Sequence, residues 1–124
     1  MCCIFIRCKS LKNINLSNFN TQNVINMRAM FNICKSLTNL NLSSFNTKNI
    51  TDMSHMFAGC KSLKDIKFNF NTENVKDMSY MFQRCNSLKD INLSNFNTQN
   101  VTNMNGIFSN CKSLTNINVS NFNT

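Results

Sequence analysis

The most regular pattern in this chain is a short alternation of apolar and polar residues that recurs along its length. In residues 37–42, Leu40 and Leu42 fall on one face of an extended segment, and Asn39 and Asn41 fall on the other. This alternation predicts a short strand with one buried face and one solvated face.

A second pattern precedes each predicted strand and has the spacing of an amphipathic helix. In residues 52–60 the apolar side chains are Met53, Met56, Phe57 and Cys60, at positions i, i+3, i+4 and i+7. An Asp or Asn that suits a helix N-cap stands before this run in four places: Asn26, Asp52, Asp77 and Asn103. We therefore expect short helices and strands to alternate.

Both patterns belong to one repeating unit. Five cysteines lie 26, 26, 25 and 26 residues apart, and Phe and Leu columns keep the same spacing: Cys8, Cys34, Cys60, Cys85 and Cys111. A period of this size is typical of stacked-repeat proteins. Residues 68–70 stand where the preceding unit has residues 42–45, so one residue is missing there, and we expect the deletion to fall in a turn.

No unit of this size can bury two apolar faces alone, but stacked units bury them together. The sequence therefore predicts an α/β repeat solenoid over residues 1–124, with about five repeats of 25–26 residues. A parallel sheet would form one side and short helices the other. Met1 aligns with Met27 and Thr124 with Thr98, so we expect an array that starts and ends in mid-repeat, as a piece of a longer one would.

Composition adds two features to this picture. The net charge is +8, from 13 Lys and Arg against 5 Asp and Glu, which favours anionic partners and also solubility. Asn makes up about a fifth of the chain.

No apolar run approaches the roughly 18 residues of a membrane span, and the first seven residues are too short and wrongly flanked for a signal peptide.

The repeat resembles the BspA-like leucine-rich repeats of bacterial surface proteins, especially the variant of 25 to 26 residues found in predicted lipoproteins. Over essentially the whole chain, the unit fits that motif position by position, as the second copy illustrates: Met27, Met30, Phe31, Cys34, Leu37, Leu40 and Leu42. The resemblance implies a right-handed superhelix at the cell surface or secreted, which acts in adhesion through host or cell-surface proteins. It implies no catalytic residue.

The cysteines and the histidine are the first candidates for chemistry. The five spaced cysteines fit an apolar core column, although disulfides between neighbouring repeats or a metal site are alternatives. Zinc sites need clustered ligands at short spacing, and the chain has one His. Cys2 and Cys3 lie outside the apolar pattern and are expected to be exposed thiols. His55 lacks the partners of a general base and is expected on a helix surface.

Two polar surfaces are candidates for binding. One is the outward face of the predicted sheet, a nearly neutral, Asn-rich surface suited to a protein partner: Asn13, Asn15, Asn39, Asn41, Asp65, Lys67, Asp90, Asn92, Asn116 and Asn118. The other is a basic edge just before the strands: Lys9, Lys35, Lys61 and Lys112. The basic edge could bind a polyanion, but the exposed aromatic residues that would stack on bases are missing, which disfavours specific nucleic-acid binding.

These observations favour a non-enzymatic binding module that needs no cofactor. No phosphate-binding glycine loop, carboxylate pair or nucleophile with its base can be found. Adhesion through the Asn-rich face is the leading hypothesis, with polyanion binding at the lysine edge as an alternative. A non-functional fragment of a larger surface-protein gene is the third.

Overall fold

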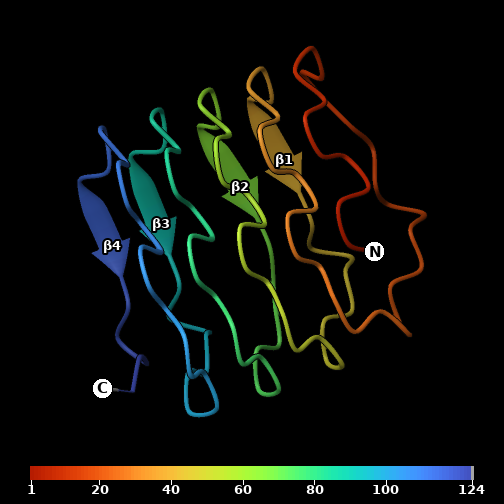
Figure 1. The fold of residues 1–124 in the computed structure, drawn as a ribbon, viewed down its shortest axis with the longest axis vertical. Helices are drawn as coiled ribbons and strands as arrows, with labels where there is room; N and C mark the ends of the chain where they lie inside the picture. The colour runs from red at the N-terminus through yellow and green to blue at the C-terminus, as the bar shows by residue number, and fades with distance from the viewer. Residues whose placement is uncertain (124) are drawn as a thin grey trace.

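The computed structural model describes residues 1–123, which follow a stack of similar turns of the chain (Figure 1). The strands are β1 (Asn39–Asn41), β2 (Asp65–Lys67), β3 (Asp90–Asn92) and β4 (Asn116–Asn118). β1 pairs with β2 and β3 with β4, both in parallel. The predicted alternation is confirmed in β1, where Leu40 is buried and Asn39 and Asn41 are exposed.

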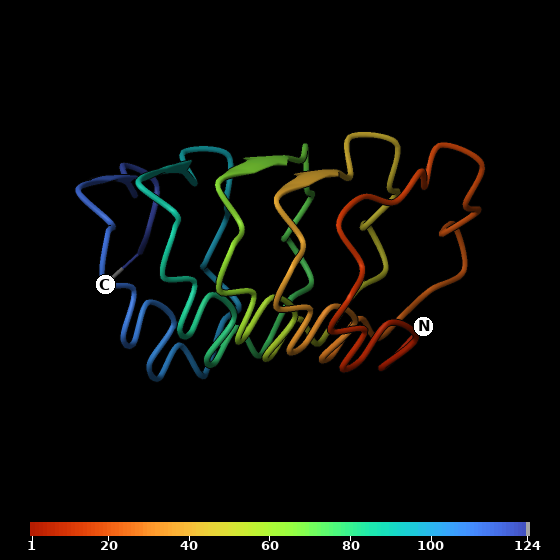
Figure 2. The same cartoon turned by 90° about the horizontal axis from the view of Figure 1, so that it is seen from above.

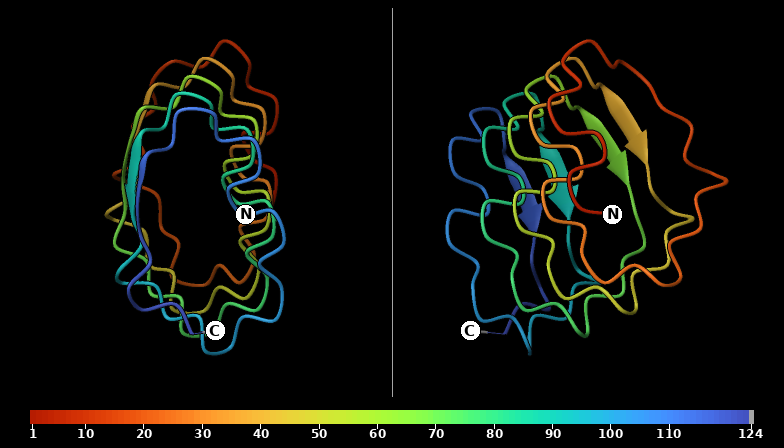
Figure 3. Two further views of the ribbon diagram at one scale, coloured as in Figure 1. Left: turned by 90° about the vertical axis from the view of Figure 1, so that its left-hand side faces the viewer. Right: turned by 45° about the vertical axis from the view of Figure 1, so that its right-hand side comes forward.

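Each circuit of the chain, which we call a coil, is numbered by its central phenylalanine, from coil 1 to coil 5: Phe5, Phe31, Phe57, Phe82 and Phe108. The strands lie along one side of the stack, the sheet side, and tight turns lie along the opposite, turn side (Figure 2). Viewed along the stack, the coils superimpose as one elongated outline (Figure 3). The turn side comprises residues 26–34, 52–60, 77–85 and 103–111, together with the first eight residues.

The helices predicted on the turn side are wrong. Residues 1–123 contain no helix, and two positions in every coil have a left-handed backbone, as at His55 (φ 56°) and Gly59 (φ 78°). A right-handed helix cannot pass through such residues. The equivalent non-glycine positions are left-handed as well: Cys3, Arg7, Ala29, Ile33, Tyr80, Arg84 and Asn110.

Hydrogen bonds on the turn side alternate between two directions. Every second N–H donates to the next coil, as from Phe31 to the Met56 carbonyl at 2.9 Å. The N–H groups between them close turns within the coil, as from Cys34 to the Phe31 carbonyl at 3.1 Å. The predicted N-cap residues close turns instead, since the Asp52 carboxylate accepts the Ser54 N–H at 2.8 Å. This pattern satisfies the backbone without a helix.

The apolar columns form the single core that the periodicity predicts. Met, Phe, Cys, Leu and Ile side chains of the middle coils are buried together. The turn-side phenylalanines stack along the whole molecule, with neighbouring ring centroids 5.3 to 5.9 Å apart. Each coil thus covers the apolar face of the one before it, which is how short repeats obtain a shared core.

A column of buried threonines binds the coils together below the strands. The Thr47 hydroxyl donates to the Asn71 carbonyl at 3.0 Å and accepts the Asn71 N–H at 2.8 Å. Thr21 and Thr72 make the same pair of bonds to the coil that follows each. One hydroxyl therefore serves as the partner of two backbone groups of the next coil.

The predicted sheet is not continuous, and this corrects the expectation of one sheet across the repeats. Residues 13–15 form no strand, and no pairing joins β2 to β3 within residues 1–123. The second break coincides with the missing residue, because Phe68 follows β2 where Leu42 and Leu93 follow β1 and β3. Leu42 N–H donates to Lys67 across the β1–β2 pair, whereas Phe68 packs its ring on Phe70 at 5.0 Å.

Candidate interaction surface

The ten residues predicted to line the sheet face are all exposed. Eight lie in the four strands. Asn13 and Asn15 belong to the irregular segment beside β1. Asn13 joins the first two strands in one depression of about 320 Å³, lined by Asn13, Ile14, Asn39, Leu40, Asn41, Asp65 and Lys67. The structure therefore brings the predicted residues of coils 1 to 3 together on one surface.

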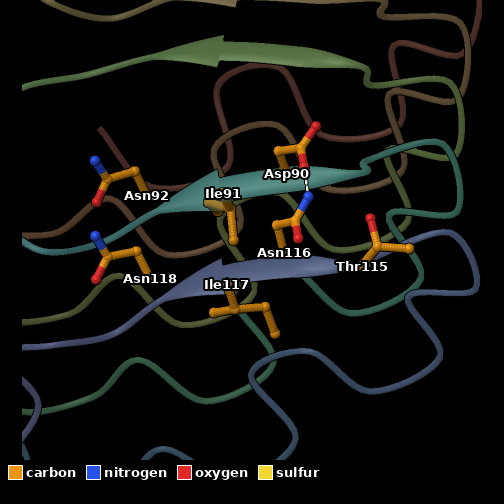
Figure 4. A pocket seen from close by; sticks show the side chains of 7 residues that line it. All are labelled: Asp90, Ile91, Asn92, Thr115, Asn116, Ile117 and Asn118. Carbon is orange, nitrogen blue, oxygen red and sulfur yellow. Dashed lines mark hydrogen bonds between the residues drawn. The ribbon is translucent and has the colours of Figure 1, made fainter.

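A second depression, of about 600 Å³, lies over β3 and β4 (Figure 4). Asn92 and Asn118 project side by side from neighbouring strands. Asp90 and Asn116, two residues earlier in each strand, form a second such pair. The Asn116 amide donates to the Asp90 carboxylate across the pair. Ile117 is 44% exposed and lines this depression together with Ile91.

The asparagines at the strand ends have a structural role that the sequence reading missed. The Asn41 side-chain oxygen accepts the Ser43 N–H at 3.1 Å and so closes the turn after β1. The same bond joins Asn15 to Ser17, Asn92 to Ser94 and Asn118 to Ser120. The recurring Asn-x-Ser spacing was the available signal, since Asn readily forms such turns. The amide oxygen is therefore used internally in this column.

The break between β2 and β3 forms a groove of about 220 Å³. Asp65 and Asp90 lie on its two sides, and Phe68, which is half-buried, lies along it. The two aspartates are among the residues predicted from the sequence, whereas the aromatic lining is not. The one-residue deletion was the sequence signal for this groove. It shortens the connection that in the other coils runs from the strand to the buried phenylalanine.

The predicted basic edge is present as exposed side chains. Lys9, Lys35, Lys61 and Lys112 are exposed at equivalent positions of four coils. Asn86 takes this position in coil 4, and its side-chain oxygen is buried without a hydrogen-bond partner in the described part of the chain. The basic edge is thus interrupted at coil 4 by Asn86, whose side-chain oxygen lacks the hydrogen bond that buried polar atoms normally make.

Of the five spaced cysteines, Cys34, Cys60 and Cys85 are buried in the core, and Cys8 and Cys111 are half-buried against it. Each thiol from Cys34 to Cys111 donates to a phenylalanine carbonyl of the preceding coil, as from Cys60 to Phe31 at 3.1 Å. All seven cysteines are free thiols, so the disulfide alternative is wrong for this structure. Burial raises the pKa of Cys34 to about 11 and that of Cys60 and Cys85 well above the ordinary range. A protonated, hydrogen-bonded thiol is a packing group.

His55 lies on a turn and not on a helix surface, which corrects its predicted place. It is half-buried and stacks on Tyr80, with ring centroids 5.0 Å apart. The next position in this column is Gly106, where an added Cβ would lie 2.5 Å from the Tyr80 ring. The column therefore packs aromatic rings over the left-handed turns.

Within residues 1–123, no group of three or more His, Cys, Asp or Glu side chains could hold a metal ion.

The comparisons with known proteins concern the repeat. A family profile described as "Mycoplasma protein of unknown function, DUF285" matches residues 1–91 and again residues 34–124. No curated protein matches the chain. Among solved structures, the T. pallidum leucine-rich repeat protein TpLRR matches with a TM-score of 0.43 and 18% identity. That match covers 82% of this chain and 66% of TpLRR. In the part of the chain that the structure describes, no helix has the length and hydropathy needed to cross a bilayer.

Proposed function

We propose that this chain, which belongs to the Mycoplasma protein family DUF285, is a non-enzymatic protein-interaction module of the leucine-rich-repeat type. The observation that carries the proposal is the polar sheet face, whose ten predicted residues are all exposed above an apolar core. Stacked repeats present such faces as extended binding surfaces. The right-handed solenoid of the BspA-like class is part of the same proposal.

The chemistry of this face suits a peptide or protein backbone. Each strand-end asparagine uses its oxygen to close a turn, as Asn41 does with Ser43, which leaves the amide NH₂ group to donate outward. Asn13 and Asn39 lie beside this column and add amides that close no turn. An extended partner could therefore accept hydrogen bonds at successive coils, about 5 Å apart.

The resemblance to BspA-like repeats extends the proposal to place and partner. It supports display of this module on a bacterial cell surface, or its secretion, with adhesion to a host or cell-surface protein as the outcome. A lipoprotein or other surface protein would present the face to such partners.

The test is capture of surface proteins from host cells by immobilised chain, with identification of the bound protein and measurement of its affinity. The variant replaces Asn13, Asn39 and Asn116 with Ala, because none of these side chains closes a turn. The Asn39 and Asn116 amides each donate one bond within the chain, to Thr38 and Asp90, and keep a second N–H for a partner. We expect at least a tenfold loss of affinity, since each lost hydrogen bond costs about 0.5–1.5 kcal/mol.

The matched control replaces Asn18 and Asn23, which are exposed away from the strands, with Ala. It should bind as the parent chain does. Equal binding by the sheet-face variant and the parent, with both folded by circular dichroism, would show that the sheet face is not the binding surface.

A second candidate function is polyanion binding, which the alignment of four exposed lysines on the basic edge favours. Replacing Lys35 and Lys61 with Gln should lower the salt concentration at which the chain leaves a heparin column. Asn86→Lys, which fills the gap in the edge, should raise it. The control replaces Lys48 and Lys76, which lie outside the basic edge, with Gln and so changes the net charge by the same amount. An equal shift of the eluting salt concentration in this control would mean that net charge alone causes the effect.

A further inference from the structure

The two cysteines at the start of the chain differ from the five that recur with the repeat. Cys2 and Cys3 occupy the positions of Arg28 and Ala29 in the next coil, so the repeat does not require a cysteine at either place. Cys2 is exposed and Cys3 is half-buried. Neither thiol donates to a phenylalanine carbonyl, which is the role of the core cysteines.

The fold holds the two thiols against each other. Their Sγ atoms lie 2.8 Å apart, and the Cys3 backbone is left-handed at φ 62°. The Cys3 N–H donates to the Arg28 carbonyl at 3.1 Å, and its thiol points to the same oxygen at 3.7 Å. This turn-side hydrogen bond between coils 1 and 2 therefore helps to fix the conformation that brings the sulfurs together.

We infer that Cys2 and Cys3 form a reversible oxidation site whose co-reactant is a peroxide. One sulfur attacks the peroxide oxygen, the O–O bond breaks, and a sulfenic acid and one water form. The second sulfur then attacks the sulfenic sulfur, the S–O bond breaks, and the S–S bond forms as a second water leaves. The two thiols lose two electrons and two protons in all, and hydrogen peroxide is reduced to two waters.

Reversibility follows from the positions of the two residues. Neighbouring Cα atoms are about 3.8 Å apart, whereas disulfides ordinarily join Cα atoms about 4.4–6.8 Å apart. A bond between adjacent cysteines is therefore strained, and strained exposed disulfides are readily reduced. Cys34, Cys60 and Cys85 are excluded from this chemistry because their thiols are buried away from a dissolved peroxide. The hydrogen bond to Cys3 raises the pKa of the Cys2 thiol as well, so exposure and pairing, and not acidity, distinguish the site.

The sequence provides a direct readout of this reaction. Trypsin cleavage after Arg7 releases peptide 1–7, which contains Cys2 and Cys3 and no other cysteine. The folded chain is treated with limiting hydrogen peroxide, the remaining thiols are alkylated in denaturant, and the peptides are weighed. We expect peptide 1–7 to lose two hydrogen atoms and to take up no alkylating agent, and dithiothreitol to reverse this. Peptide 85–89, which carries Cys85, should remain fully alkylated.

Variants separate the paired site from general thiol reactivity. Cys2→Ser and Cys3→Ser should each abolish the disulfide and leave a sulfenic acid on the remaining sulfur, whereas Cys8→Ser should leave the product unchanged. The reaction should be on the order of tenfold faster in the folded chain than in urea, because the fold positions the sulfurs. Disulfide-linked dimers, oxidation of Cys8 in place of the pair, or an equal rate in urea would overturn the assignment.

Discussion

The turn side and the sheet side of this molecule follow the same repeat but tolerate change differently. From Asn26 to Cys34 and at the three equivalent places, the turn side always spans the same number of residues, and its bridges run through Asn26, Asp52, Asp77 and Asn103 without a break. On the sheet side one coil is a residue shorter, and strand pairing stops between β2 and β3. The turns therefore set the register of the stack, and the sheet adapts to it.

The largest expected difference between the two sides concerns their aromatic residues. Phe57 is fully buried between Phe31 and Phe82, so Phe57→Ala should lower the free energy of unfolding by about 3–5 kcal/mol. Phe68→Ala, at the half-buried ring beside the break, should cost less than half as much. Urea denaturation of both variants measures the difference, and equal losses would contradict the leading role of the turn side.

The buried threonines should have the next largest effect. Thr47→Val removes the hydroxyl that serves the Asn71 N–H and carbonyl, so we expect a loss of about 1–3 kcal/mol. Thr51→Val is the matched control, because the Thr51 hydroxyl makes one exposed bond, to the Ile25 carbonyl. Its cost should stay under about 0.5 kcal/mol in the same denaturation experiment. A similar cost for both variants would show that the two hydrogen bonds to Asn71 add nothing to stability.

Restoring the missing residue should repair the sheet. Inserting Ser between Phe68 and Asn69 gives coil 3 the length of its neighbours and should let β2 pair with β3, with a gain of about 1 kcal/mol. Hydrogen exchange should slow at Phe68 and in β3. The same insertion between Ser43 and Ser44, where no residue is missing, should destabilise the chain. Unchanged exchange after the first insertion would mean that the bulk of Phe68, and not the loop length, separates the strands.

The smallest effect should come from the left-handed turns. Arg84 is exposed with φ 58°, a conformation that glycine adopts without steric cost, so Arg84→Gly should stabilise the chain by about 0.5–1 kcal/mol. Arg28 is equally exposed but is not left-handed, and Arg28→Gly should destabilise by a similar amount. The two changes should shift the melting temperature in opposite directions, and shifts of one sign would rule out backbone strain as the cause.

The sequence predicted burial better than backbone conformation. Alternation around Leu40 identified the strand and its buried face, and the spacing of Met53, Met56 and Phe57 identified the apolar side of the turns. That spacing also fits consecutive tight turns, so it could not distinguish them from a helix. The local signal was limited to Gly59, Gly106 and Asn110, whose residue types favour a left-handed backbone, because most coils place other residues there.

The candidate site was predictable as a surface but not in its details. Exposure of the Asn columns follows from alternation alone, and all ten residues are exposed. The use of the Asn41 oxygen to close a turn and the groove beside Phe68 depend on local geometry that the pattern does not specify. The contact between the Cys2 and Cys3 thiols depends likewise on the left-handed backbone at Cys3.

The hydrogen bonds between coils have a mechanical consequence. They join one coil to the next, so a force that pulls the ends of the stack apart loads the contacts between two coils at a time. Such a load peels coils away one after another and meets modest resistance at each step. Among the described residues, strand pairing is absent between coils 1 and 2 and again between coils 3 and 4, so these two planes are the weakest. A tether under tension would therefore part first at one of these two planes.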